Sequence, residues 1–166
     1  MMKTILVSMG LLAVLLSGAS CSAEGDKSAA TKGATAAGME KAAWFTSYDQ
    51  AKTESLKRNV PILVDFSGSD WCGWCIKLEQ EVFSKTEFKD FADKNLVLLL
   101  VDFPRRKALS AAITKQNEKL AADFSVTGFP TVLILDGQGK ELARTGYQPG
   151  GAVEYVKHLQ GLIGKK

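Results

Sequence analysis

Residues 62–75 read ILVDFSGSDWCGWC, and the fold is inferred from this stretch. It begins with a short, almost continuously apolar run, which is typical of a β-strand covered on both faces. It ends with two cysteines spaced three residues apart, where the sequence takes up the spacing of apolar residues that an α-helix requires. The stretch therefore predicts a strand, a loop and a helix that begins at Cys72.

The two cysteines are the candidate chemical centre. The attacking species in disulfide exchange is a thiolate, and the unpaired N–H groups in the first turn of a helix stabilise its negative charge. Cys75 lies on the same helical face as Cys72 and within bonding reach, so the spacing permits a reversible local disulfide. We expect Cys72 to be the attacking nucleophile and Cys75 the resolving thiol. A CxxC pair alone is also compatible with zinc binding or a structural link.

The sequence on either side of this centre alternates between helical and extended patterns. Ser47 and Gln50 form a capping box before a helix that ends near Asn59. Further elements are expected in the order strand 62–66, helix 72–83, short helix around 88–91, strand 96–101, helix 108–124, hairpin 131–135 with 141–144, and helix 150–163. This order predicts an α/β fold with a central mixed β-sheet flanked by helices on both faces.

Three segments resemble the thioredoxin family, namely Val64-Asp65-Phe66, Trp71-Cys72-Gly73-Trp74-Cys75 and Gly128-Phe129-Pro130-Thr131. The resemblance covers most of residues 41–166 and implies a thioredoxin-like fold. It also implies that Pro130 is in the cis form and faces the cysteine pair across the substrate groove. The backbone of Phe129 would then be free to pair with an extended substrate strand, and Phe129 would influence selectivity. The alternative is a proline that only begins a strand.

Asp65 matches the acid that the family keeps one turn below the resolving cysteine. The resemblance implies that Asp65 relays a proton from the thiol of Cys75. A carboxyl group in an apolar strand should have a raised pKa, because burial penalises its charge. The alternative is an acid at a strand end that reaches solvent or a backbone donor.

The chain also departs from thioredoxins proper. Trp74 stands where they have proline, and Leu98 stands about where they carry a buried lysine beside the acid. The closer resemblance is to exported single-domain thioredoxin-like proteins that share the pattern Ser-Asp-Trp-Cys-x-x-Cys-x-Lys-Leu-Glu, here residues 69–79. Trp71, Gly73 and Trp74 are candidate substrate-binding residues, and a purely structural place for Trp71 in the core is an equally good interpretation.

The first 20 residues predict a signal peptide of the bacterial lipoprotein type. Lys3 precedes an apolar run, and small residues lead directly into Cys21, which would become the lipidated first residue of the mature protein. The alternative is ordinary cleavage nearby, with Cys21 as a spare thiol. Residues 21–40 are mostly Ala, Gly, Ser and Thr and predict a flexible tether. The thioredoxin-like domain is expected over residues 41–166.

The composition excludes several classes of function. The 166 residues carry a net charge of +3, which is too small to indicate a nucleic-acid-binding surface. Hydrophobic residues make up 46% of the sequence, which is enough to form a core. Three cysteines and one histidine are too few for a disulfide scaffold or a metal cage, so no metal and no bound cofactor are expected. The run 105–107, Arg-Arg-Lys, is either a solvated loop or a docking patch for an acidic partner.

These observations predict an exported, lipid-anchored thiol–disulfide oxidoreductase of the bacterial cell envelope. Its substrates would be protein disulfides or dithiols, reduction would be the more favoured direction, and a membrane or periplasmic redox partner would restore its cysteines. The alternative is a non-enzymatic envelope protein that uses the same fold as a binding module or a metal carrier.

Overall fold

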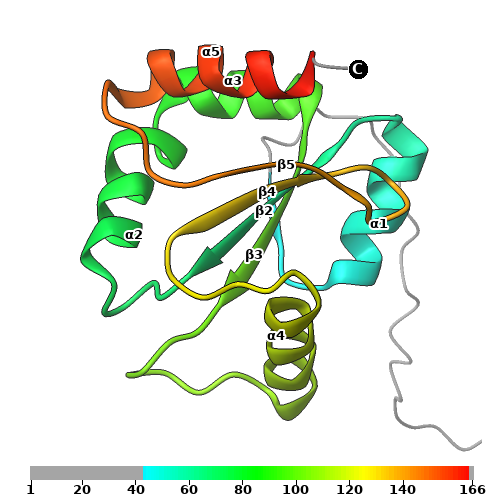
Figure 1. Cartoon of the computed structure of the whole chain (residues 1–166), viewed down its shortest axis with the longest axis vertical. Coiled ribbons are helices and arrows are strands. Elements are labelled where there is room, and N and C mark those ends of the chain that lie inside the picture. Colours follow the sequence, from blue (N-terminus) through cyan, green and yellow to red (C-terminus); the bar gives the residue numbers. More distant parts are fainter. Residues whose placement is uncertain (1–42, 165–166) are drawn as a thin grey trace, which may run out of the picture. The chain divides into compact units, whose positions relative to one another are not determined.

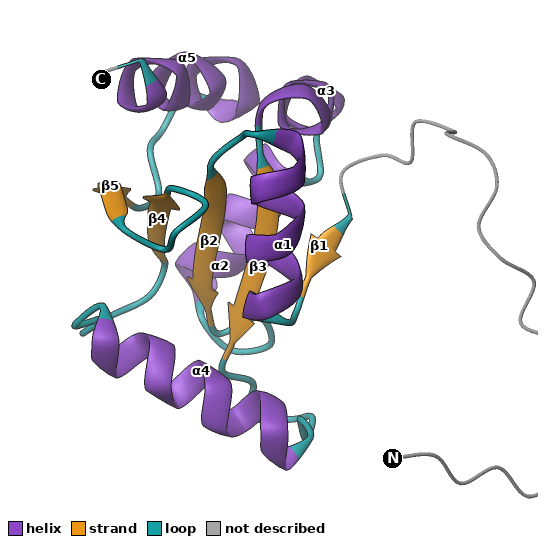
Figure 2. Ribbon diagram, turned by 90° about the vertical axis from the view of Figure 1, so that its right-hand side faces the viewer, coloured by secondary structure: helices purple, strands orange, loops and turns teal. Residues whose placement is uncertain are grey.

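The computed structural model describes residues 43–164 (Figure 1). The predicted signal peptide, Cys21 and the tether therefore lie outside the described residues. In this described part, a five-stranded sheet is covered by helices on both faces, and Figure 2 shows one helix in front of the strands and another behind them. None of the helices between residues 43 and 164 is long and apolar enough to span a membrane.

The sheet is mixed, as the sequence predicts. Its strands are β1 (Trp44–Phe45), β2 (Ile62–Ser67), β3 (Val97–Asp102), β4 (Thr131–Leu135) and β5 (Glu141–Thr145), and their spatial order is β1-β3-β2-β4-β5. β1 and β2 run parallel to β3, whereas β4 is antiparallel to both β2 and β5. The short edge strand β1 was not predicted, because two residues are too few to show any periodicity.

The helices are α1 (Tyr48–Arg58), α2 (Gly73–Leu78), α3 (Thr86–Asn95), α4 (Ala111–Asp123) and α5 (Gly151–Ile163), with a π-helical turn η1 (Glu79–Phe83) directly after α2. The predicted helix over 108–124 begins three residues late, because the hydroxyl of Ser110 accepts a hydrogen bond from the N–H of Ile113 and caps α4. The predicted strand over 96–101 is shifted by one residue, to 97–102.

The alternation of side chains along β2 divides the core into two clusters. Ile62, Val64 and Phe66 pack with Ala51 of α1 and Leu120 of α4 on one face. Leu63 packs on the other face, with a cluster that draws on η1, α3 and α5. Because Asp65 is two residues after Leu63, its side chain is directed to this second face, beneath α2.

Parallel strands bring the carboxyl ends of β2 and β3 to the same edge of the sheet, and the cysteines follow there. Asp102, at the end of β3, is 5% exposed, and its carboxylate accepts hydrogen bonds from both the backbone N–H and the hydroxyl of Ser69, at 2.9 and 2.7 Å. The N–H of Cys72 donates to the carbonyl of Gly68 at 2.8 Å. These bonds hold the loop that places Cys72 at the beginning of α2.

Candidate active site

The cysteine pair occupies the first turn of α2. Cys72 is the N-cap residue, and its sulfur accepts a hydrogen bond from the N–H of Cys75 at 3.2 Å. The structure contains the Cys72–Cys75 disulfide, with 5.2 Å between the two Cα atoms. Both residues are largely buried, with Cys72 8% and Cys75 4% exposed. The helix thus begins at the position that the sequence predicts, with an N–H group directed at the sulfur of Cys72.

One side of the disulfide, which we call the Cys72 flank, consists of Trp71, Phe103, Arg105 and Phe129. The indole N–H of Trp71 donates to the carbonyl of Phe103 at 2.8 Å. The ring of Phe129 packs edge-on to Trp71 and stacks on Phe103, with centroids 6.0 and 5.1 Å apart. The guanidinium carbon of Arg105 lies 3.7 Å from the Trp71 ring centroid. The indole is therefore held by contacts on several sides.

A glycine makes this packing possible. A Cβ atom at Gly68 would lie only 2.5 Å from an atom of the Trp71 ring. Any larger residue would therefore displace the indole from its place against the loop after β3. Sequence reasoning did not single out Gly68 or Phe103, because neither carries reactive chemistry and their role depends on contacts across the fold.

A groove of about 410 Å³ opens beside Cys72. It is lined by Trp71 and Cys72 from the active-site loop and by Val126, Thr127, Gly128 and Phe129 from the loop before β4. The peptide bond between Phe129 and Pro130 is cis, as the resemblance implied, and Pro130 directly precedes β4. The structure thus brings together the two sequence motifs that lie more than fifty residues apart.

The other side of the disulfide, the Cys75 flank, consists of Asp65, Trp74, Lys77, Glu79 and Tyr147. Trp74 is 58% exposed, and its ring lies 5.2 Å from that of Tyr147. The ammonium nitrogen of Lys77 is 5.2 Å from the centroid of each ring. Trp74 and Gly73, which is also exposed, are the parts of the motif that face solvent.

Asp65 lies beneath Cys75 and is 5% exposed. Its Oδ1 atom has no hydrogen-bond partner among the described residues. Burial and, to a smaller extent, the negative charges of Glu79 and Asp102 raise the pKa of Asp65 to about 8, although a hydrogen bond with the side chain of Ser67 acts in the opposite sense. The raised pKa agrees with the sequence-based expectation. The alternative was an acid that reaches solvent or a backbone donor, whereas the carboxyl group is buried and its hydrogen bond is with the side chain of Ser67.

Glu79 is a site residue that sequence reasoning quoted only as part of a motif. It lines a hollow of about 350 Å³ together with Asp65, Cys75 and Trp44. Burial raises the pKa of Glu79 above its ordinary value, while Lys89 acts in the opposite sense. The available signal was its position four residues after Cys75, which places both residues on one side of the helix.

Leu98, the residue in place of the family's lysine, is buried. The charged groups that act on Asp65 are accordingly both acidic, Glu79 and Asp102. Asp65 therefore keeps its proton to a higher pH than an acid paired with a cation would.

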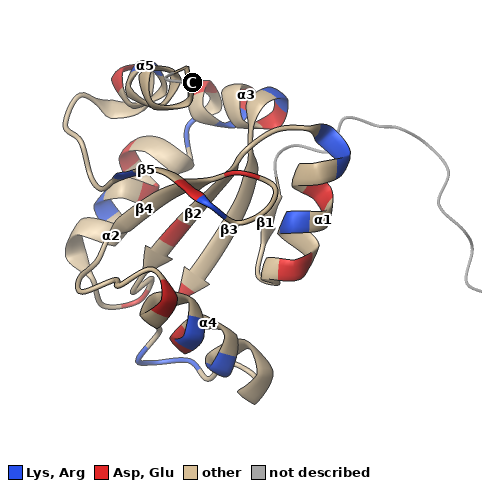
Figure 3. Ribbon diagram, turned by 45° about the vertical axis from the view of Figure 1, so that its right-hand side comes forward, with Lys and Arg blue, Asp and Glu red and all other residues tan. Residues whose placement is uncertain are grey.

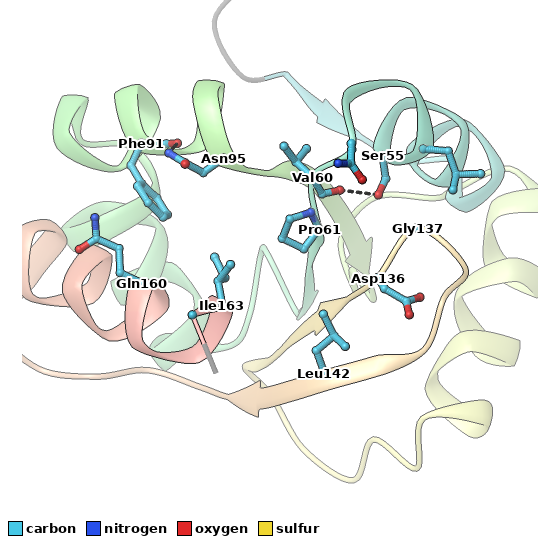
Figure 4. A pocket seen from close by; sticks show the side chains of 13 residues that line it. Ser55, Val60, Pro61, Phe91, Asn95, Asp136, Gly137, Leu142, Gln160 and Ile163 are labelled. Carbon is cyan, nitrogen blue, oxygen red and sulfur yellow. Dashed lines mark hydrogen bonds between the residues drawn. The ribbon is translucent and has the colours of Figure 1, made fainter. Parts of the chain in front are cut away.

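A larger pocket, of about 510 Å³, lies at the opposite end of β2 and β4 (Figure 4). Val60, Pro61, Leu142 and Ile163 give it a mostly apolar lining. Its acidic residue, Asp136, accepts hydrogen bonds from two N–H groups of its own turn, so it serves the hairpin. Within residues 43–164 no three His, Cys, Asp or Glu side chains are grouped so that they could hold a metal ion.

Comparison with known proteins agrees with this geometry. The chain matches the thioredoxin-like domain family over residues 48–160. It is 39% identical over 119 residues to the disulfide bond reductase DsbH of Chlamydia pneumoniae, with 72% of each chain covered. It is 31% identical over 103 residues to the thioredoxin-related protein DsbJ of the same organism, and this match spans 62% of the chain but 30% of DsbJ.

Solved structures of related proteins agree with these sequence matches. A DsbH oxidoreductase superposes with a TM-score of 0.72 at 34% identity, covering 82% of this chain and 94% of the other. A thioredoxin from Thermus thermophilus, at 18% identity and a TM-score of 0.56 over 74% of this chain and 88% of its own, shares the fold. The cysteine pair at the start of α2, the cis proline beside it and these matches lead to one conclusion: the chain belongs to the thioredoxin-like family and is a thiol–disulfide oxidoreductase.

Proposed function

We propose that this oxidoreductase reduces protein disulfides in the bacterial cell envelope. The observation that carries the proposal is the unequal placement of the two cysteines. The sulfur of Cys72 caps α2 and borders an open groove, whereas Cys75 is buried above Asp65. The direction of electron flow is supported by the relative DsbH, which is a disulfide bond reductase.

The reaction starts from the reduced protein. The thiolate of Cys72 attacks one sulfur of a substrate disulfide, a Cys72–substrate bond forms, and the other substrate sulfur leaves as a thiolate that takes up a proton. Cys75 then loses its proton and attacks the sulfur of Cys72, which releases the second substrate sulfur as a thiolate. Two electrons have passed to the substrate, and the protein is left with the Cys72–Cys75 disulfide seen in the structure. A dithiol redox partner in the membrane or periplasm then reduces it.

Asp65 is the group that takes the proton of Cys75 in the second step. It lines the same hollow as Cys75, and one of its oxygens has no competing hydrogen bond among residues 43–164. With a pKa of about 8, Asp65 is ionised in a minor fraction of molecules at neutral pH, and in that form it accepts the proton of Cys75 readily, because a carboxylate and a thiolate of similar proton affinity exchange a proton at little cost.

The substrate would lie along the groove beside Cys72. The backbone before Pro130 is available to pair with an extended segment, and the ring of Phe129 forms one wall. Trp71, which is in contact with Phe129, also lines the groove. Gly73 has open space where a Cβ would be, and Trp74 offers an exposed ring. These features support the assignment of all five residues to substrate binding.

The location rests on the sequence before the described residues. Lipidation of Cys21 would anchor the protein to a membrane, with residues 21–40 as the tether. Mass spectrometry of the membrane fraction should show cleavage before Cys21 and added acyl mass, and Cys21→Ala should release or misprocess the protein. An unmodified soluble chain that begins elsewhere would contradict the anchor and leave the enzymatic proposal standing.

Insulin reduction with a dithiol as electron source tests the reductase activity. The chain should turn over insulin, and the reduction potential of the cysteine pair should lie below that of the substrates it reduces. The competing metal carrier would show stoichiometric zinc binding by reduced protein without turnover. A potential so high that the pair oxidises dithiols would reverse the proposed direction.

A further inference from the structure

The loop between β3 and α4 carries a cluster of basic residues that the reaction described above does not use. Figure 3 shows this run, Arg105 to Lys107, in blue on the loop that leads into α4. All three residues are exposed. One of them, Arg105, is placed over the ring of Trp71, which precedes Cys72 and forms a wall of the groove.

The loop is held in place by side chains from the active-site edge of the sheet. The two carboxylate oxygens of Asp70 accept hydrogen bonds from the backbone N–H groups of Arg105 and Arg106, at 2.9 and 2.7 Å. These bonds hold the pKa of Asp70 below its ordinary value, so the carboxylate stays charged and keeps its hold on the loop. Lys107 is 2.9 Å from the buried carboxylate of Asp102.

Because of these contacts, the three basic side chains of the loop differ in how available they are to bind an anionic group. Lys107 is neutralised by Asp102, and Arg106 interacts electrostatically with Asp70. The guanidinium group of Arg105 takes part in none of the ion pairs found within the described part of the chain, and it lies over the indole face of Trp71. Stacking on an aromatic ring orients a guanidinium group while its N–H donors remain available at its edge.

We propose that Arg105 is a specificity-determining residue that favours substrates with a carboxylate side chain close to the reacting cysteine. This inference rests on the proposed action on protein or peptide disulfides and names the class of substrate. A planar guanidinium group donates two parallel hydrogen bonds to a carboxylate. A neutral amide or hydroxyl group of the substrate would lack the negative charge that strengthens these bonds. Arg105 lies over Trp71, which lines the groove and directly precedes Cys72, so that recognition would take place at the edge of the groove.

The first test compares two peptide disulfides that differ only in a Glu or a Gln beside the cysteine. At low ionic strength the wild-type protein should show a kcat/KM about 3- to 10-fold higher for the Glu peptide, as expected for one well-placed charge. The preference should largely disappear at a salt concentration of about 0.5 M, because salt at that concentration screens the attraction between exposed charges. Equal rates for the two peptides would overturn the inference, whereas turnover of neither would overturn the proposed function instead.

The second test uses Arg105→Gln, with Lys140→Gln as a control that removes the same charge from the turn between β4 and β5. Arg105→Gln should abolish the preference for the Glu peptide, and Lys140→Gln should keep it. Cys72 is also alkylated with iodoacetate, which is anionic, and with iodoacetamide, which is neutral, and the modification is followed at that residue by mass spectrometry. Arg105→Gln should lower the iodoacetate-to-iodoacetamide rate ratio by about 3-fold.

A loss of structure around Trp71 would change both alkylation rates together and leave their ratio unchanged. If Arg105→Gln changes neither the iodoacetate-to-iodoacetamide ratio nor the preference for the Glu peptide, Arg105 only packs against Trp71, and the inference is refuted. Arg105→Lys keeps the charge without the planar fork, and it should retain part of the salt-sensitive preference.

Discussion

The two tryptophans of the motif lie on either side of the same disulfide, in very different environments. On the Cys72 flank, Trp71 donates a hydrogen bond to Phe103, packs against Phe129 and is covered by Arg105. On the Cys75 flank, Trp74 is 58% exposed, and its ring packs against Tyr147 and Lys77. The comparison shows that Trp71 helps to build the groove, whereas Trp74 presents much of its ring to solvent.

The cysteines differ in the same sense. Cys72 borders the groove and accepts an N–H bond at its sulfur, while Cys75 shares a hollow with two acids. In the function that we propose, the Cys72 flank would provide cationic and apolar contacts for a substrate, and the acids of the Cys75 flank would accept the proton of Cys75. Four sets of substitutions can break or sharpen this contrast.

The largest effect is expected from replacing the cysteines one at a time. Both Cys72→Ser and Cys75→Ser should lower insulin reduction by about 1,000-fold or more, because the reaction needs both sulfurs. Only Cys75→Ser should accumulate mixed disulfides with substrate, since Cys72 is then left without a resolving thiol. Non-reducing electrophoresis and mass spectrometry detect the trapped species. Trapping by Cys72→Ser instead would reverse the roles of the two flanks.

Asp65→Asn should change the pH dependence of stability. The pKa of Asp65 is raised from 3.8 to about 8 in the folded protein, so between these pH values the folded state binds more protons than the unfolded state. The stability of the oxidised wild-type protein should therefore fall as the pH rises from about 4 to about 8, by up to an amount on the order of 5 kcal/mol.

In Asp65→Asn this fall should be absent, and the variant should be more stable than the wild type at pH 9. Urea unfolding of the disulfide form at several pH values measures the unfolding free energy of both proteins. The same variant should also slow the release of substrate from the mixed disulfide. An identical pH profile in variant and wild type would show that Asp65 does not titrate in this range.

Replacing each tryptophan with phenylalanine compares the flanks directly. Trp71→Phe should cost about 1–2 kcal/mol of unfolding free energy, because the carbonyl of Phe103 loses its donor. Trp74→Phe should change stability by less than about 0.5 kcal/mol, as is usual for an exposed residue. Chemical denaturation measures both. Equal losses would mean that Trp74 is more firmly packed than its exposure indicates.

Glu79→Gln should have the smallest effect. It removes a negative charge that raises the pKa of Asp65, so the pH at which stability levels off should move slightly lower. The accompanying change in unfolding free energy near pH 7 should be about 0.5 kcal/mol, because Glu79 is at the surface of the helix. Glu87→Gln, an exposed acid on α3, is a matched control that should leave the profile unchanged.

The sequence was most informative where a local pattern is sufficient. The apolar run of β2 and the helix that begins at Cys72 were predicted from such patterns, and the cis bond at Pro130 was implied by the resemblance to the thioredoxin family; the structure contains all three. Its weakest point was the segment 103–110, which was partly assigned to a helix. Asp70 and Ser110 prevent that, because one binds two backbone N–H groups of the segment and the other caps α4 after it.

Residue order alone thus specified the reactive pair, its helix and the layered α/β fold, because the periodicity of apolar residues and the three-residue cysteine spacing are local properties. It could not say which tryptophan is packed, whether Asp65 is buried without a partner, or that Arg105 lies over Trp71. Those properties depend on the parallel pairing of β2 with β3, which brings segments more than thirty residues apart to one edge of the sheet. Burial and distance set the pKa values and contacts there, and both arise only when the chain has folded.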